Sequence, residues 1–264
     1  MTDDRFASPE FWAASTYAEM AHPFTSRFAE NAWALARVRA GARVLDVATG
    51  AGALALIAAR NGAHVLATDF SEGMVRRVEA AGEPNIEARR MDGQALDLPD
   101  DSFDAAFSMF SVFMFPDWRA GLREMARVLR PGGIGCVGTW NDEAGAATSL
   151  LISRLYRELF PHVALPDPPP SMKILSVPES LAAEMQTAGF AAVSVTAVSH
   201  DFILEAPALD AGNNLFSFSP VWDKLSSDEQ GRLLDKARTM LDPDGVIRVP
   251  STALIAIGTK PQFT

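Results

Sequence analysis

Two glycines and two aspartates in the first third of the chain have the types and spacing that suit binding of a nucleoside. Gly50 and Gly52 follow the apolar run 44–47 and precede an alanine-rich stretch, so they predict a strand-to-helix turn whose backbone can approach a ligand closely. Asp69 ends the next apolar run, 17 positions after Gly52. A carboxylate at that place can accept hydrogen bonds from both ribose hydroxyls of an adenosine lying across the strand ends.

The glycine turn and Asp69 alone leave the type of ligand open. Residues 50–55 also fit the Gly-x-Gly-x-x-Gly/Ala fingerprint of dinucleotide-binding proteins, so a nicotinamide cofactor is one interpretation. Asp46 favours another, because a carboxylate there can meet the ammonium of an amino-acid ligand, a group that NAD lacks. The run 92–94 (Asp-Gly-Gln) can read an adenine, with the carboxylate accepting from its amino group and a backbone N–H donating to a ring nitrogen. An adenosine that carries an amino acid is therefore favoured.

Strand-like and helix-like runs alternate through the middle of the chain, a pattern that predicts a parallel sheet with right-handed crossovers. We expect strands at residues 44–47, 64–68, 86–91, 103–109 and 134–140, and helices at 54–60, 72–81 and 117–129. Further on, we expect helices at 150–160, 179–188 and 227–240, extended runs at 192–204 and 246–257, and a proline-rich loop at 166–170. No linker is long enough to divide the chain, so we expect a single domain over residues 1–264.

Composition and charge argue against several classes of protein. Hydrophobic residues make up 48% of the 264 residues and charged residues 21%, which is enough to build a core. The formal net charge of −10 disfavours a nucleic-acid partner. No window reaches the roughly 18 apolar residues of a membrane span, and the polar start of the sequence does not resemble a signal peptide. The one cysteine, Cys136, cannot form an intramolecular disulfide. We therefore expect a cytoplasmic monomer or homodimer without nucleic-acid or membrane partners.

Taken in order, these motifs resemble the class I S-adenosylmethionine (SAM)-dependent methyltransferases, and most of all the ubiquinone/menaquinone-biosynthesis type and its small-molecule relatives. The resemblance covers about half of the chain and is carried by Val44 to Gly52, Asp69, Asp92-Gly93, the run 98–104 (LPDDSFD) and the run 129–133 (LRPGG). It departs at Ala48, where the family usually has glycine. The resemblance implies an α/β, Rossmann-like fold with a seven-stranded, mostly parallel sheet whose last strand is antiparallel and lies beside the sixth.

The resemblance also implies SAM as the cofactor and a role for individual residues. The methionine end of SAM would lie against Asp46, Ala48, Thr49, Gly50 and Gly52, with Tyr17 closing over its carboxylate. The nucleoside would be held by Asp69, Phe70, Met74, Asp92, Gly93 and Gln94, and the sulfonium would be faced by Phe110 and Ser111.

Three segments would form a helical cap over the carboxyl ends of the strands in such a fold. They are residues 9–38, 141–175 and 206–245, and each is rich in large apolar side chains. We interpret them as the lid of a mostly apolar pocket for a small apolar or aromatic methyl acceptor.

Methyl transfer from a sulfonium asks little of side chains beyond alignment of the reactants and exclusion of water. A hydroxyl acceptor would also need a general base, for which His22, His162 and Asp142 are the candidates. His64 opens a strand and is interpreted as structural, and His200 is left open. The scattered histidines predict no metal site.

Two other functions stay open. A nicotinamide-dependent reductase would need a Tyr-x-x-x-Lys pair or its equivalent, and neither tyrosine fits: Tyr17 is followed four positions later by Ala21, and Tyr156 by Phe160. A SAM-binding protein that does not methylate is compatible with every motif.

Overall fold

A seven-stranded sheet forms the centre of the protein. We analysed a computed structural model, which describes residues 8–13, 15–164, 167–210, 216, 219 and 221–262, and for residues 13 and 15–21 the backbone alone. The strand order is β3-β2-β1-β4-β5-β7-β6. The strands are β1 (Arg43–Val47), β2 (His64–Asp69), β3 (Ile86–Arg90), β4 (Phe103–Met109), β5 (Leu129–Trp140), β6 (Ala191–Glu205) and β7 (Val246–Thr259).

The direction of the strands confirms the predicted fold class. β1 to β5 pair in parallel, with Asp46 of β1 opposite Ala67 of β2 and Phe107 of β4. β7 is inserted between β5 and β6 and runs antiparallel to both. Because all carboxyl ends of the parallel strands meet at one edge, the loops that follow β1, β2, β3 and β4 gather there.

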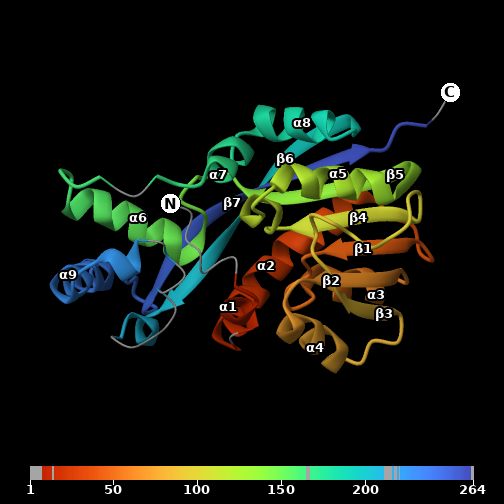
Figure 1. Cartoon of the computed structure of the whole chain (residues 1–264). Helices are drawn as coiled ribbons and strands as arrows, with labels where there is room; N and C mark the ends of the chain where they lie inside the picture. The colour runs from red at the N-terminus through yellow and green to blue at the C-terminus, as the bar shows by residue number, and fades with distance from the viewer. Residues whose placement is uncertain are drawn as a thin grey trace.

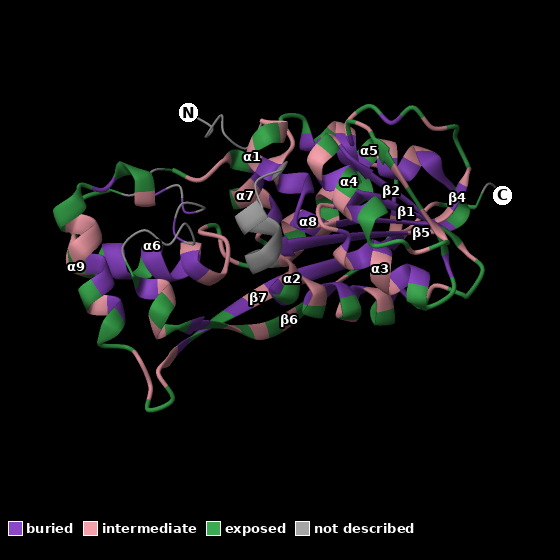
Figure 2. Cartoon of the chain, turned by 90° about the horizontal axis from the view of Figure 1, so that it is seen from below, coloured by how far each residue is buried: buried purple, intermediate pink, exposed green. Residues whose placement is uncertain are grey.

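Helices cover both faces of the sheet, as Figure 1 shows. The α-helices are α1 (Pro9–Ala13), α2 (Ser15–Ala36), α3 (Ala53–Arg60), α4 (Glu72–Ala80), α5 (Trp118–Val128), α6 (Ala147–Leu159), α7 (Pro170–Leu175), α8 (Pro178–Thr187) and α9 (Ser227–Arg238). α2 and α3 pack their alanine-rich sides on one face, and α5 and α8 pack larger side chains on the other. The strands between them are buried while the outer sides of the helices are exposed (Figure 2).

A second, smaller core lies beyond the edge of the main sheet. β5 ends its pairing with β7 at Ala253, but β6 continues along β7 as a two-stranded ribbon to the pair Glu205–Val246. α6, α9 and the 3-10 helix η3 (Ala206–Leu209) pack against this ribbon around a buried apolar cluster. We call these elements the outer lobe, and Figure 1 shows it to one side of the other helices. Its helices lie within the predicted cap segments 141–175 and 206–245, and its ribbon is formed by the end of β6 and the start of β7.

Two elements differ from the prediction. Pro170, predicted to lie in a loop, begins α7, since proline is well suited to the first turn of a helix. β5 begins at Leu129 and not at Ile134, because Leu129 already pairs with Phe103 before the register shifts. The second difference depends on pairing with a distant strand.

Candidate functional site

The turn between β1 and α3 is held in left-handed backbone conformations. Ala48, Gly50 and Gly52 have φ angles of 54°, 55° and 84°. Alanine tolerates this region less well than glycine, at a cost of about 1 kcal/mol, so Ala48 is a mildly strained position. No atom lies within 4 Å of where a Cβ on Gly50 would be, so the backbone at Gly50 borders open space. The turn therefore leaves room for a ligand beside its peptide groups.

Two buried carboxylates flank this turn. Asp46 Oδ2 accepts hydrogen bonds from Thr49 Oγ1 at 2.6 Å and from the backbone N–H of Ala55 at 3.1 Å. Asp69 accepts from the N–H groups of Gly50 and Ser71, both at 2.9 Å. Burial raises the pKa of Asp46 to about 7 despite these hydrogen bonds, and the neighbouring charge of Asp69 adds to the shift. Burial also raises the pKa of Asp69.

The loop after β3 forms another wall. Asp92 Oδ1 accepts from the backbone N–H and the side-chain amide of Gln94, and Gln94 Oε1 accepts from the N–H of Asp117 at the start of α5. A Cβ on Gly93 would lie 2.8 Å from atoms of both Phe115 and Val47. Only glycine fits at position 93 without displacing these side chains.

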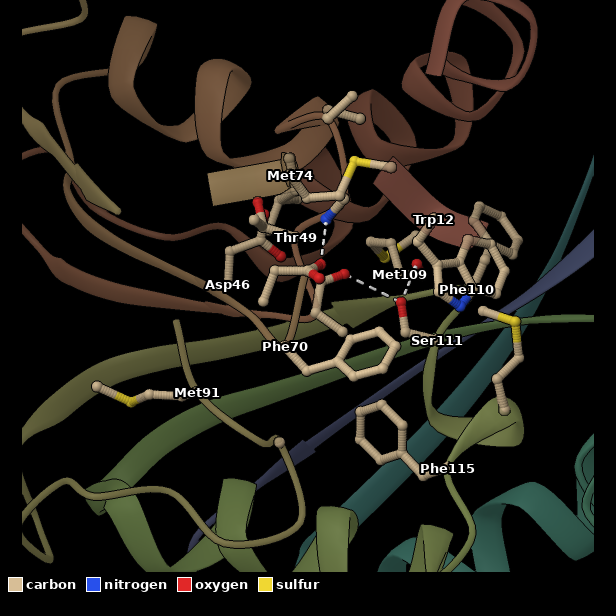
Figure 3. Close-up of a pocket in the computed structure, with 18 of the residues that line it drawn as sticks. Trp12, Asp46, Thr49, Phe70, Met74, Met91, Met109, Phe110, Ser111 and Phe115 are labelled. Atoms are coloured by element: carbon tan, nitrogen blue, oxygen red, sulfur yellow. Dashed lines mark hydrogen bonds between the residues drawn. The ribbon is translucent and has the colours of Figure 1, made fainter. Parts of the chain in front are cut away.

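The segment after β4 forms a further wall of the site with Phe110 and Ser111. Phe110 has a φ of 61°, and its ring stacks on Trp140 with 3.9 Å between centroids. Ser111 Oγ lies 3.1 Å from both the carbonyl of Ala48 and that of Met109, so the hydroxyl links this segment to the glycine turn (Figure 3). Strained backbone at Ala48 and Phe110 is typical of functional sites.

These walls enclose one cavity of about 680 Å³, within the usual range for small-molecule sites. It is lined by twelve of the fourteen predicted cofactor residues, namely Asp46, Ala48, Thr49, Gly50, Asp69, Phe70, Met74, Asp92, Gly93, Gln94, Phe110 and Ser111. Gly52 instead precedes α3 as its N-cap and is not part of the lining. The side chain of Tyr17 lies outside the described residues.

The structure separates the candidate bases. His22 lines the cavity. His162 is exposed in the loop after α6, and Asp142 accepts from the N–H of Ala144 in the turn after β5; neither lines the cavity. His200 lies 2.8 Å from Asn31 Oδ1, outside the cavity lining.

Several lining residues were not predicted. Thr25 lies one turn after His22 on α2, Arg90 and Met91 directly precede Asp92, and Met109 directly precedes Phe110. Arg90 Nε donates to the carbonyl of Phe70 at 3.0 Å and so steadies the turn after β2. Arg90 and Met91 could have been predicted, because they directly precede Asp92, which we expected to bind adenine. Nothing in the sequence singled out Thr25.

The described part of the chain contains neither a cluster of metal-ligating side chains nor a membrane-spanning helix. No group of three or more His, Cys, Asp or Glu side chains is placed to hold a metal ion there. No helix in those ranges has both the length and the apolar character to cross a membrane.

Comparison with known proteins relates part of this chain to a known family. A family described as "Methyltransferase domain" matches residues 44–133. An uncharacterized protein of Mycobacterium tuberculosis (strain H37Rv) is 35% identical over 164 residues, which are 61% of this chain and 59% of that protein. The chain thus spans about three fifths of the length of its first curated relatives.

Two further similarities agree with that match. The demethylmenaquinone methyltransferase of Clavibacter sepedonicus is 42% identical over 111 residues, which are 39% of this chain and 45% of that enzyme. The crystal structure of the YcgJ protein of Bacillus subtilis has the same fold, with a TM-score of 0.58 and 19% identity over 90% of this chain and 99% of its own.

Proposed function

We propose that the chain is a SAM-dependent methyltransferase, which binds SAM in the described cavity and transfers the methyl group to a small, largely apolar or aromatic acceptor. The observation that carries the proposal is the make-up of this cavity. Buried carboxylates, an open glycine turn and a set of apolar side chains line the same space.

The residues present fit the cofactor. Both hydrogen bonds of Asp46 end on Oδ2, so Oδ1 is left to accept from the ammonium of the methionine part. Asp69 holds the turn through Gly50 and can also accept from the ribose hydroxyls. The exposed carboxylate of Asp92 and the backbone beside Gly93 can read the adenine edge.

SAM supplies an activated methyl group on its sulfonium. The chain's own residues must then orient the acceptor and keep water out, and orientation of this kind can contribute about 7–11 kcal/mol. The apolar side chains of the lining suit that task, because they exclude water and favour an apolar acceptor. They are Trp12, Phe70, Met74, Met109, Phe110, Met114 and Phe115.

The proposal extends to the surroundings of the protein. The net charge of −10 speaks against a nucleic-acid partner, and the single cysteine suits a reducing compartment such as the cytoplasm. We expect a monomer or a homodimer of a single domain, which light scattering after gel filtration would measure.

Calorimetric titration with S-adenosylhomocysteine (SAH) tests the cofactor, with NADH and NADPH as parallel ligands. We expect saturable micromolar binding of SAH alone, lost in Asp69→Ala and weakened in Asp69→Asn, which keeps the shape of the side chain. The matched control is Asp97→Asn, an exposed aspartate outside the cavity lining. Binding of a nicotinamide cofactor in place of SAH would refute the proposal and favour a reductase.

Transfer itself needs a second assay. Incubation with SAM labelled on its methyl group and a set of small aromatic and aliphatic acceptors should yield labelled product. Binding of SAH without turnover on any acceptor would instead support a SAM-binding protein that does not methylate.

A further inference from the structure

His22 is placed at the cavity by a firmly anchored helix. It lies on α2, and Ser26 Oγ donates to its carbonyl at 2.6 Å. Two and six residues further along, Phe24 and Phe28 pack against the ring of Trp140, and Phe28 also contacts Phe110. Because Phe110 itself lines the cavity, these contacts fix the position of α2 relative to the site.

The imidazole of His22 lacks the partners that a structural histidine has. Its Nδ1 is buried and makes no hydrogen bond with the described residues. Its Nε2 likewise makes no hydrogen bond with the described residues. By contrast, Nε2 of His200 lies at hydrogen-bonding distance from Asn31. A buried, unpaired imidazole nitrogen costs about 1–3 kcal/mol, so a structural role alone does not explain His22.

We propose that His22 is the proton acceptor of the methyl-acceptor site and that the acceptor carries a phenolic or enolic hydroxyl. This inference rests on the proposed function and adds the chemical class of the second substrate to it. Of the three candidate bases, His22 lines the cavity, whereas His162 and Asp142 do not.

The surroundings of His22 make it a weak base. Burial lowers the pKa of the ring, and the positive charge of Arg60 on α3 acts in the same direction. The residues that face α2 from β6 make their contacts further along the helix: His200 Nε2 lies 2.8 Å from Asn31 Oδ1, and Arg27 donates to the backbone carbonyl of Asp201. The other ionisable groups of the cavity lining are Asp46, Asp69, Arg90 and Asp92. No carboxylate contacts the ring of His22 in the described structure to strengthen it as a base.

A weak, neutral base selects the acceptor by acidity. Proton transfer to a weak base becomes less favourable as the acidity of the hydroxyl falls, so an aliphatic alcohol is a poorer partner for His22 than a phenol or enol. A neutral amine attacks through its own lone pair without prior loss of a proton. A phenol or enol lies between these cases. In the step, the hydroxyl proton passes to an imidazole nitrogen and the oxygen forms a bond to the methyl carbon. The carbon–sulfur bond breaks, its electron pair stays on sulfur, and the products are the methyl ether, neutral SAH and an imidazolium that releases its proton to water.

The role of His22 as a base can be tested by varying the acidity of the acceptor, because the effect of losing a merely structural histidine would not depend on that acidity. Wild-type protein and His22→Gln would be assayed with labelled SAM and a series of ring-substituted phenols from 4-methylphenol to 4-nitrophenol, with 2-naphthol as a larger probe. We expect His22→Gln to lower kcat about 10²–10³-fold on 4-methylphenol, as loss of a general base does. The loss should shrink towards nothing on 4-nitrophenol, which is largely ionised at pH 8. The acidic limb of the wild-type pH profile should disappear in the variant.

The matched control is His64→Gln, because His64 is exposed at the start of β2 and outside the cavity lining. It should leave every rate unchanged. An equal loss in His22→Gln across the whole series would assign His22 a structural role and overturn the inference. Methylation of amines but of no phenol or enol, or of none of these probes, would overturn the acceptor class. Either result can occur while SAH still binds through Asp69, so the failure of the cofactor proposal is distinguished from the failure of this one.

A second readout needs no turnover. NMR of the histidine rings, assigned with His22→Gln and His64→Gln, should show the His22 ring titrating at lower pH in the folded protein than in the unfolded chain. Addition of 4-methylphenol to the SAH complex should shift the His22 signals and leave those of His64 in place. Unchanged His22 signals at saturating phenol would refute contact between the ring and the acceptor.

Discussion

The raised pKa of Asp46 predicts that binding of SAH depends on pH. The carboxylate is completely buried at the base of the glycine turn, and this burial raises its pKa to about 7. An ammonium group binds the ionised form of a carboxylate and not the neutral acid. The ligand must therefore find Asp46 ionised or displace its proton.

The size of the effect follows from the pKa. About nine tenths of Asp46 is ionised at pH 8 and about one tenth at pH 6, so the apparent affinity for SAH should fall about tenfold between them, or 1.4 kcal/mol. Burial lowers the pKa of His22, so its ring titrates on the acidic side of an ordinary histidine.

Calorimetry in two buffers of different ionisation enthalpy measures both the affinity and the protons released. Nearly one proton should leave the protein per SAH bound at pH 6, and almost none at pH 8. Asp46→Asn keeps the shape of the side chain and should bind more weakly at pH 8, without the pH dependence. Any dependence that remains in the variant reports Asp69, whose pKa is also raised by burial. Equal affinity of the wild-type protein at pH 6 and pH 8 would refute the role of Asp46.

Three other outcomes are expected. Without ligand, folded Asp46 keeps a proton that the unfolded chain has released, so its contribution to the free energy of unfolding should fall by about 4 kcal/mol as the pH rises from about 4 to about 7. Urea unfolding at several pH values should show a smaller loss in Asp46→Asn, in which the raised pKa of Asp69 remains. Gly93→Ala should lower the free energy of unfolding by about 1–3 kcal/mol, since its Cβ would clash with Phe115 and Val47, and a thermal midpoint equal to that of the wild type would contradict this steric reason. Cys136 is buried in β5 and burial raises the pKa of its thiol, so a thiol reagent should label it only after denaturation; labelling of the native protein would show that this part of the sheet opens.

The parts of the site that were predictable are local in sequence. Asp46, the glycine turn and Asp69 lie at the ends of short apolar runs, and the end of a parallel strand fixes where the next residues lie in space. Spacing along the chain therefore determines their positions. The order and direction of the strands followed from a family resemblance that these motifs carry.

The parts that were not predictable depend on contacts between distant segments. His22 and His162 were equivalent candidates in the sequence, and only the packing of Phe28 on Phe110 and Trp140 brings α2 to the cavity. The outer lobe likewise depends on the pairing of β6 with β7 beyond the end of β5. Apolar side chains in the cap segments indicated burial but not the surface against which they pack.

The pKa of Asp46 is raised and the pKa of His22 is lowered, because burial favours the neutral acid of Asp46 and the neutral ring of His22. Each step of the proposed reaction then needs one of them to gain charge, Asp46 on binding of the cofactor and His22 on loss of the acceptor proton. Both the affinity for SAH and the rate of transfer should therefore rise with pH, and a pH profile of wild-type turnover alone cannot assign its acidic limb. The variants separate the two groups because they act on different quantities. Asp46→Asn should remove the pH dependence of SAH binding and retain that of kcat at saturating SAM, whereas His22→Gln should do the reverse.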